Sequence, residues 1–314
     1  MPTSPEEHYR QCRPLGGARK RVGGDPMSAA IRILQGKFGR VALLDMNMLL
    51  VSHAHHHCHV LIKAFGADTY FSVRGQPQPL TDDSAVLINA WEPHSYSHNG
   101  AEVQRTVILA LYIEPGWLAG IQQALTVSAH PHFFQQPCVA LSPAARKLAD
   151  ALARDMLLTA ELPSGQLEER LFELMIATIE HHSEWRSYQS LLGTLRQHHG
   201  DVRIRKAISR MRENIGQSVD MDVLAAECGL SRAHFFELFR KTTKLTPRVY
   251  ANVLRMEAAI TALTAGETPI ADLAYDMGFS APGHFTRFFR EHLGTTPTEY
   301  RRVVDLLEPA KDGR

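Results

Sequence analysis

The C-terminal third of the chain carries one motif twice, and this duplication constrains the fold more than any other feature. In each copy an apolar stretch ends at a glycine, a serine two positions later precedes an aromatic-rich stretch, and a Thr-Pro pair follows. These positions are Gly229, Ser231 and Thr246-Pro247 in the first copy, and Gly278, Ser280 and Thr296-Pro297 in the second. Glycine permits the left-handed backbone that ends a helix, and serine caps the helix that follows. Two helices joined by a tight glycine turn form a helix-turn-helix, whose second helix enters the DNA major groove. One such match is weak evidence because such helix pairs are common, but two in tandem are strong evidence.

A single helix is predicted between the two copies. Apolar residues from Val249 to Leu263 recur at alternating steps of four and three, which is the spacing of one buried helix face. This helix starts at Thr246-Pro247 and ends at Gly266, so it ties the two units together rigidly. In residues 203–304, 15 Lys and Arg outnumber 11 Asp and Glu, although the whole chain has a formal net charge of only +1. The uneven charge gives modest support for a surface that faces phosphate.

Residues 202–304 resemble the DNA-binding domain of the AraC/XylS (arabinose-regulator) family of bacterial transcription factors. The resemblance rests on the paired positions above and on these further residues: Leu224-Ala225, Phe239-Arg240, Arg255, Ile270-Ala271-Asp272-Leu273-Ala274, His284-Phe285, Phe288-Phe289-Arg290 and Glu299-Tyr300-Arg301. It implies an all-α domain of two helix-turn-helix units joined by one connecting helix. It also implies that two recognition helices read successive major-groove segments, about one helical turn or roughly 34 Å apart.

Each recognition helix presents outward residues that can contact DNA. Arginine can bond guanine through two hydrogen bonds, Phe236 can contact a thymine methyl group, and Glu237 can accept from cytosine N4 or simply keep non-specific binding weak. His284 shares its repeat position with His234, where a base contact and a buried spacer are both open. The predicted base-reading residues are Arg232, Ala233, Phe236, Glu237, Gly283, His284 and Arg287, and the predicted phosphate contacts are Arg240, Lys241 and Arg290.

Residues 31–140 carry the signals of an all-β domain. Short β-branched and aliphatic runs alternate with turn residues, and such runs at near-regular spacing predict an antiparallel sandwich or barrel. The runs are Val41–Leu50, Val60–Phe65, Thr69–Val73, Ser84–Ile88 and Val103–Tyr112. A histidine-rich strand, a turn at Gly75 and the pair Pro93-His94 make residues 36–112 similar to the cupin-like effector barrel of the same family. That similarity implies a pocket for a small polar or anionic ligand, lined by His55, His57, Tyr70, Trp91, His94 and Tyr96.

The histidines between His53 and His59 raise a second hypothesis, a bound metal ion. Metal-binding cupin barrels place His-x-His and a glutamate on one strand and a further histidine on a later strand, because alternate residues face the lumen. His53 and His55, or His55 and His57, supply such a pair, and His94 supplies the third ligand. No glutamate follows the pair at the expected distance. We therefore assign the histidines to a pocket, expect no metal, cofactor or catalytic residue, and keep a metal-dependent cupin enzyme fused to a DNA-binding domain as the alternative.

Residues 141–185 are expected to form helices. Ser142-Pro143 is a typical helix start, and a second helix is predicted from Gln166 to His182. Its apolar stripe has nearly the spacing of a coiled-coil seam. The stripe can pack on the chain's own barrel, form a subunit interface in a dimer, or do both. The candidate dimerisation residues are Leu167, Leu171 and Leu174.

The remaining segments are expected to be connections. Residues 1–30, rich in Pro, Gly and Arg, are read as a flexible arm, residues 186–201 as a linker and residues 305–314 as a tail. The four cysteines, Cys12, Cys58, Cys138 and Cys228, are scattered and indicate neither a zinc finger nor a disulfide framework. No apolar stretch resembles a signal peptide or a membrane span, so we expect a protein of the bacterial cytoplasm, associated with the nucleoid and not with a membrane.

The sequence thus predicts a regulator without enzymatic activity. It is expected to bind promoter DNA sequence-specifically, to respond to a small-molecule effector held in the barrel, and to form a homodimer. By resemblance it activates transcription, with RNA polymerase as a further partner. A third hypothesis is a constitutive regulator whose barrel serves only in dimerisation.

Overall fold

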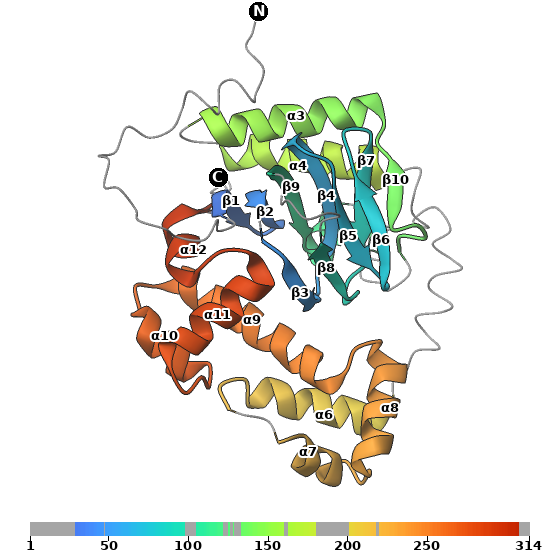
Figure 1. The fold of residues 1–314 in the computed structure, drawn as a ribbon, viewed down its shortest axis with the longest axis vertical. Coiled ribbons are helices and arrows are strands. Elements are labelled where there is room, and N and C mark those ends of the chain that lie inside the picture. Colours follow the sequence, from blue (N-terminus) through green and yellow to red (C-terminus); the bar gives the residue numbers. More distant parts are fainter. Residues whose placement is uncertain are drawn as a thin grey trace, which may run out of the picture.

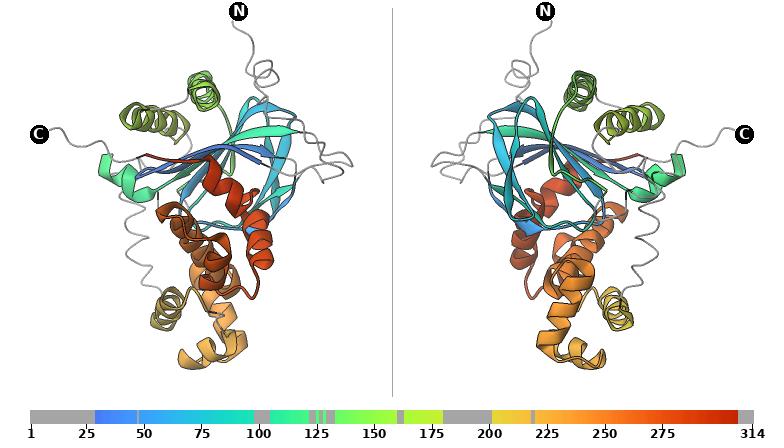
Figure 2. Two further views of the ribbon diagram at one scale, coloured as in Figure 1. Left: turned by 90° about the vertical axis from the view of Figure 1, so that its left-hand side faces the viewer. Right: turned by 90° about the vertical axis from the view of Figure 1, so that its right-hand side faces the viewer.

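The structure is a computed structural model that describes residues 29–46, 48–97, 105–121, 125, 128, 133–159, 163–179, 201–217 and 220–307. Nearly all of the predicted arm and linker, and the last seven residues of the predicted tail, lie outside these residues. The N-terminal half is a β domain with helices on one side, and the C-terminal half is helical (Figures 1 and 2). The predicted fold class is therefore confirmed.

The β domain consists of two sheets. The larger has the order β10-β7-β4-β9-β2-β1-β11, and the smaller has the order β3-β8-β5-β6. All pairs are antiparallel except β1 with β11. The strands are β1 (Ala29–Gly36), β2 (Gly39–Met46), β3 (Leu50–His53), β4 (Cys58–Gly66), β5 (Thr69–Val73), β6 (Gln76–Leu80), β7 (Ser84–Ile88), β8 (His94–Ser97), β9 (Thr106–Ile113), β10 (Cys138–Ala140) and β11 (Val304–Leu306).

The larger sheet is apolar on both faces, which explains why its strands read as continuous hydrophobic runs. Successive side chains of a strand point to opposite faces. Val60 and Ile62 of β4 belong to the core under the helices, whereas Leu61 between them belongs to a second cluster with Phe71 and Tyr96 of the smaller sheet. The space between the two sheets is thus filled by apolar side chains.

Within the described residues, the helices that accompany the β domain are α2 (Pro115–Ile121), α3 (Pro143–Leu158) and α4 (Ser164–Ile179). The Ser142 side chain accepts a hydrogen bond from the backbone N–H of Ala145 and starts α3 as predicted. In Figures 1 and 2, α3 and α4 lie on one side of the β domain and the C-terminal helices lie on the opposite side.

The predicted dimerisation stripe on α4 serves the protomer itself. Leu167, Leu171 and Leu174 are 1%, 0% and 0% exposed, and they belong to the core that α3 and α4 form with the larger sheet. A side chain without accessible surface cannot contact a second chain, so the assignment of these three leucines to a dimer interface is wrong. Packing on the chain's own barrel, the other hypothesis, accounts for the stripe.

The C-terminal half repeats one plan twice around a long central helix. The first unit contains α6 (Val202–Glu213), α7 (Met221–Glu227) and α8 (Arg232–Thr243), the second contains α10 (Ile270–Asp276), α11 (Pro282–Leu293) and α12 (Pro297–Val303), and α9 (Pro247–Ala265) joins them. Ser231 caps α8, Thr246 caps α9, and Thr296 with Glu299 forms a capping box at α12.

The start of α11 differs from the prediction. We expected Ser280 to cap this helix, but the cap position is Ala281, which makes no side-chain cap bond, and Pro282 is the first helical residue. Proline has a helical φ angle and no N–H that needs a partner, so it starts the helix without a serine. The Ser280 hydroxyl instead lies 3.0 Å from Nδ1 of His284.

The glycine turn of the second unit touches the segment that follows α6 in the first unit. Gly278 has φ +78°, and a Cβ atom there would lie 2.5 Å from the backbone oxygen of Gly216, which follows α6. Gly229 has a similar φ of +68°, but a Cβ atom there would meet nothing within 4 Å. Gly278 therefore serves both as a helix end and as the close contact between the units, whereas Gly229 serves only as a helix end.

Replacing the two glycines by alanine separates these roles. The left-handed backbone alone disfavours alanine by about 1–2 kcal/mol, and this is the expected loss of unfolding free energy for Gly229→Ala. Gly278→Ala adds a backbone clash, so we expect a loss larger by at least about 1 kcal/mol. Chemical denaturation of both variants measures the difference, and equal losses would contradict the close contact.

Candidate DNA-binding surface and histidine site

The first recognition helix, α8, presents a polar face to solvent. Phe235 and Phe239 point into the core, whereas the predicted reading residues Arg232, Ala233 and Glu237 are exposed and Phe236 is half-buried. Nη1 of Arg232 lies 2.5 Å from Oδ2 of Asp222 on α7, and this ion pair raises the pKa of the arginine. The guanidinium also lies 5.4 Å from the centre of the Phe236 ring.

The second recognition helix, α11, likewise turns its aromatic residues toward the core and its predicted reading residues toward solvent. Phe285 and Phe289 are buried, whereas Gly283, His284 and Arg287 are exposed, with 67% of the Arg287 side chain accessible. His234 and His284 are both exposed, so neither is a buried spacer.

The connecting helix sets the distance between the two reading faces. α9 has 19 residues, which corresponds to roughly 28 Å at 1.5 Å per residue. In Figure 1, α8 lies near one end of α9 and α11 lies beside its other end. This separation is comparable with the roughly 34 Å between successive major-groove segments on one DNA face.

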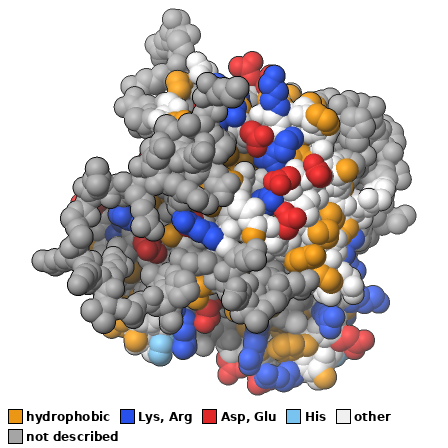
Figure 3. All heavy atoms as spheres, turned by 45° about the horizontal axis from the view of Figure 1, so that its top comes forward, with side chains coloured by type: hydrophobic (Ala, Val, Ile, Leu, Met, Phe, Trp, Pro, Cys, Tyr) orange, Lys and Arg blue, Asp and Glu red, His pale blue; other side chains and the backbone are white. Residues whose placement is uncertain are grey.

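Positive side chains gather beside α8. Arg232, Arg248 and Arg255 line a polar groove of about 440 Å³ between α7, α8 and α9, together with Asp220 and Asp222. On the face that includes α3, by contrast, acidic and basic side chains are interspersed (Figure 3).

The predicted phosphate contacts have different surroundings. Lys241 is exposed at the end of α8, and Arg290 is half-buried in α11. Arg240 is exposed but lines a cavity of about 510 Å³ whose other wall includes Arg74 and Trp91 of the β domain.

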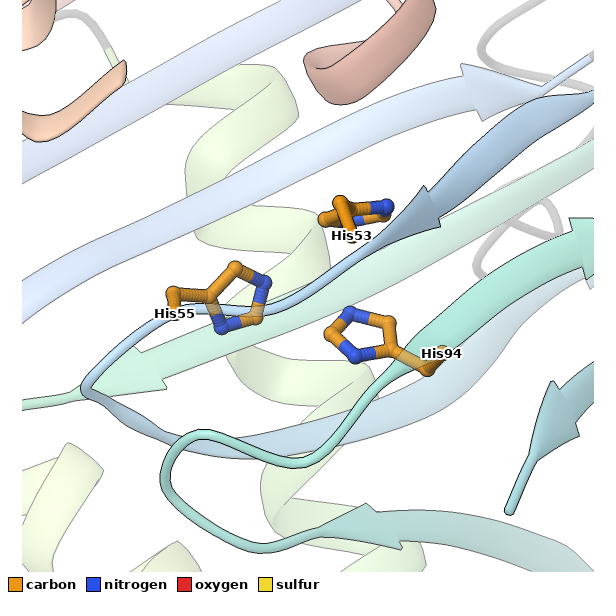
Figure 4. Close-up of side chains that lie close together, drawn as sticks. All are labelled: His53, His55 and His94. Atoms are coloured by element: carbon orange, nitrogen blue, oxygen red, sulfur yellow. The ribbon is translucent and has the colours of Figure 1, made fainter. Parts of the chain in front are cut away.

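The histidines gather at the end of the β domain that faces the C-terminal helices. β3 pairs with β8 so that His53 lies opposite His94. The ring centres of His53 and His94 are 4.3 Å apart. The ring centre of His55 lies 4.7 Å from that of His94 and 4.8 Å from that of His59. In Figure 4, the rings of His53, His55 and His94 converge from the two chain segments.

These buried rings are neutral. Burial is the largest cause of their lowered pKa values, since it disfavours the charged imidazolium. Repulsion between neighbouring rings, if both were charged, adds to the effect in His53, His55 and His59, and the charge of Arg40 adds to it in His57 and His59. The pKa of His94 falls to about 4. The pKa values of four other histidines fall well below the usual value, namely those of His53, His55, His57 and His59.

His56 differs from its neighbours because it is half-exposed and faces carboxylates. Burial opposes its charged form, but Glu114, whose Oε2 lies 3.0 Å from Nε2 of His56, and the charge of Glu257 outweigh burial and raise its pKa. Glu257 belongs to α9, and its Oε1 lies 3.9 Å from Nδ1 of His56. The pair of His56 with Glu257 therefore links the β domain to the C-terminal half.

Three of the residues predicted to line the effector pocket have different surroundings. Tyr96 is packed in the apolar cluster between the sheets, where Thr69 donates a hydrogen bond to its hydroxyl. His55 lines a cavity of only about 20 Å³. Trp91 lines the cavity of about 510 Å³ beside α8 instead. Among the described residues, Tyr96, His55 and Trp91 thus do not line one common cavity, and the effector pocket inside the barrel stays a prediction.

Trp91 also joins the β domain to α9. Its backbone N–H donates to the carbonyl of His55 at 2.7 Å, which fixes the turn before β8. Its ring stacks on that of Tyr250 with centres 4.7 Å apart and an angle of 4° between the planes.

The sequence analysis missed Arg40, which lies at the centre of the contact between the two halves. This β2 residue is 4% exposed, its guanidinium lies 4.7 Å from the centre of the Tyr112 ring, and its Nη2 lies 3.8 Å from Oε1 of Glu257. Burial alone would lower its pKa, but interactions with Tyr300 and Glu257 outweigh burial and raise it. Arg40 and Asp45 are the two charged residues of a strand that is otherwise apolar, and this pattern was the available signal.

Comparison with known proteins identifies both halves. Residues 50–175 match the family model described as AraC-like ligand binding domain, and residues 224–303 match that described as Helix-turn-helix domain. The class of protein is thus a ligand-responsive, sequence-specific DNA-binding transcriptional regulator. Over both halves, the chain is therefore similar to AraC-type regulators.

Relatives of the whole chain are regulators as well. The HTH-type transcriptional activator RhaS of Shigella sonnei (strain Ss046) is 23% identical over 257 residues, which cover 80% of this chain and 87% of that protein. RhaS of Escherichia coli O1:K1 / APEC matches with the same identity and coverage. A crystal structure of an apo ToxT variant from Vibrio cholerae strain SCE256 covers 90% of this chain and 100% of its own, with a TM-score of 0.50 at 13% identity, which shows the fold alone.

Among the described helices, none is long and apolar enough to cross a membrane.

Replacing Arg40 tests the contact between the two halves. In Arg40→Leu the buried cation that faces Tyr112 and Glu257 is lost, and we expect the unfolding free energy to fall by about 2 kcal/mol. Arg210→Leu is the control, because Arg210 forms an exposed ion pair with Glu213, and such pairs contribute about 0–1 kcal/mol. Equal stability of the two variants in chemical denaturation would show that Arg40 does not hold the halves together.

Proposed function

We propose that this chain is a transcriptional activator that binds an asymmetric promoter site with α8 and α11 in successive major-groove segments. The single observation that carries this proposal is the placement of two exposed, polar recognition helices near the ends of one rigid helix, α9. Activation is supported by the RhaS relatives, which are transcriptional activators. The proposal places the protein on nucleoid DNA in the bacterial cytoplasm.

The two reading faces differ in chemistry. On α8, Arg232, Phe236 and Glu237 offer a donor, an apolar group and an acceptor to base edges. The start of α11 offers few side chains, because Pro282 and Gly283 occupy its first positions. Base reading by the second unit therefore depends on His284 and Arg287, and we expect its half of the site to be less stringent.

The effector is proposed to bind in the cavity between the β domain and α8. Its volume of about 510 Å³ lies within the range of small-molecule sites. Trp91 supplies an aromatic face, and Arg240 and Lys244 of the DNA-binding half supply positive charge. These groups suit a small anionic molecule with an apolar body. Such a ligand would contact both halves of the chain and so favour one arrangement of them.

Two further partners belong to the proposal. A second copy of the chain is proposed to associate through α3 and α4, which lie on the side of the β domain opposite to the C-terminal helices. RNA polymerase is proposed as a partner because the RhaS relatives are described as activators.

Base reading by the second unit is tested at Arg287. A bidentate contact with guanine is worth about 1–3 kcal/mol of discrimination, so Arg287→Ala should relax specificity at one base pair by that amount. Binding to a library of site variants measures this, with Arg302→Ala as control because Arg302 is exposed on α12, away from the reading face. A uniform loss across all sequences would make Arg287 a phosphate contact.

Phosphate binding is tested at Lys241. Loss of one phosphate contact weakens binding to all sequences and lowers the slope of log K against log salt by about 0.9. We expect this change for Lys241→Ala in salt titrations of promoter binding, and none for Lys147→Ala, which removes an exposed lysine of α3. An unchanged slope for Lys241→Ala would contradict the assignment.

A further inference from the structure

Three neutral imidazoles converge where the β domain meets the DNA-binding half. His53, His55 and His94 are all buried, at 5%, 4% and 2% exposure. One nitrogen of each ring lies within 4.8 Å of the corresponding nitrogens of the other two. Figure 4 shows the rings directed toward one another from β3, the segment after it and β8. Small movements of these side chains would bring the nitrogens to the spacing of ligands around one ion.

The backbone fixes the direction of two of these rings. Nδ1 of His53 lies 2.8 Å from the carbonyl oxygen of Val51, and Nδ1 of His94 lies 2.9 Å from that of Glu92. A carbonyl oxygen only accepts, so each Nδ1 carries the proton and each Nε2 keeps its lone pair. Metal-binding histidines are commonly held by this kind of hydrogen bond, from the ring N–H to a backbone carbonyl.

The free nitrogens of the group need a partner. Within the part of the chain that the structure describes, Nε2 of His55 and Nε2 of His94 are buried without a hydrogen bond. Leaving a buried polar atom unpaired is unfavourable, and in a native structure such an atom usually has a partner, such as a bound water molecule or ion. Nε2 of His94 offers a lone pair because Nδ1 carries the proton, and a cation held between the three rings would satisfy this atom together with Nε2 of His55.

The donor set indicates the kind of cation. Three neutral imidazole nitrogens suit zinc, nickel, cobalt, copper or iron, whereas magnesium and calcium require oxygen ligands. A cavity of about 20 Å³, lined by His53, His55 and His292, adjoins the group and has room for one water molecule as a further ligand.

We propose that His53, His55 and His94 form a binding site for one divalent transition-metal ion. This inference goes beyond the proposed function, which requires no metal. The site adjoins the second recognition helix, because His292 in the last turn of α11 lies with its ring centre 6.2 Å from that of His53. Occupancy of the site therefore bears directly on the position of α11 against β3.

A second group of potential ligands, His56, His57 and Glu257, suits a cation less well. Arg40 already lies 3.8 Å from the Glu257 carboxylate, so a metal ion there would face a buried positive charge. Nε2 of His56 is also paired with Glu114 at 3.0 Å. This group serves as the control for the first.

The test measures metal content of the full chain without DNA. The protein is treated with a chelator, dialysed against Zn²⁺ and analysed for bound metal by mass spectrometry, and Co²⁺ is then titrated as a spectroscopic probe of coordination. We expect one equivalent of Zn²⁺ per chain, and absorption bands typical of histidine-bound Co²⁺. His55→Ala and His94→Ala should each weaken binding by more than about 100-fold, since loss of a supporting hydrogen bond alone weakens it 10–100-fold.

The matched control is His56→Ala, which removes a histidine of the same segment and should leave the stoichiometry and the cobalt spectrum unchanged. Circular dichroism checks that each variant folds, and His94→Gln replaces His94→Ala if the latter does not. Absence of stoichiometric metal in the wild-type chain would overturn the proposal. Loss of metal in His56→Ala, with retention in His94→Gln, would assign the site to the other group and overturn it as well. Failure of promoter binding would refute the proposed function but leave this measurement unaffected.

Discussion

The arrangement of the two halves depends on one buried guanidinium. Arg40 leaves β2 at the end of the β domain and is enclosed by Tyr112 of the same domain and by Glu257 and Tyr300 of the other half. A buried charge is tolerated only when its surroundings compensate for lost hydration. If the halves moved apart, Glu257 would leave the arginine, which would then regain water only by exposing the apolar surface around it. The contact therefore favours a defined arrangement over a loose one.

The histidines are neutral because they are buried at this same end of the β domain. They lie between a barrel interior filled with apolar side chains and the helices that cover its mouth. Without that cover, water would reach the rings and their pKa values would return toward the usual value. Their neutrality is thus a consequence of how the halves are arranged, and a group that binds these rings acts on the same arrangement.

The sequence predicted elements whose signals are local. The glycine turns, the caps at Ser231 and Thr246 and the helix between the units all depend on residues a few positions apart, and they were correct. Strand β6, which has two prolines in Gln76–Leu80, was absent from the predicted strand runs. It is tolerated because β6 lies at the edge of its sheet, where a missing N–H disrupts no central pairing.

Long-range contacts could not be predicted in this way. Strand β11, which we read as the beginning of a tail, pairs with β1 nearly the whole chain away. Arg40 with Glu257, and Trp91 with Tyr250, are likewise partners that no spacing rule connects. The space around the predicted pocket residues could not be derived from the sequence for a related reason. Alternation along a strand identifies which residues face inward, but it does not show whether their neighbours leave space between them.

The two helix-turn-helix units are attached to the β domain unequally, and this has a consequence for regulation. The core of the second unit is continuous with the apolar cluster between the sheets, since Phe285, Phe289 and Tyr300 belong to the same cluster as Ile33 and Leu44. The core of the first unit is a separate cluster, which includes only Ala54 and Trp91 from the β domain.

A ligand changes an equilibrium only as far as it binds one arrangement better than another. Moving the second unit would separate a shared core, whereas moving the first would mainly break the stack of Trp91 on Tyr250. Less free energy is thus needed to move the first unit away from the β domain than to move the second. The first unit is also the one beside the cavity that Arg240 and Lys244 line. An effector in that cavity acts where the least apolar surface must be exposed, so the orientation of α8 relative to the fixed α11 is the element that a small molecule can shift most readily.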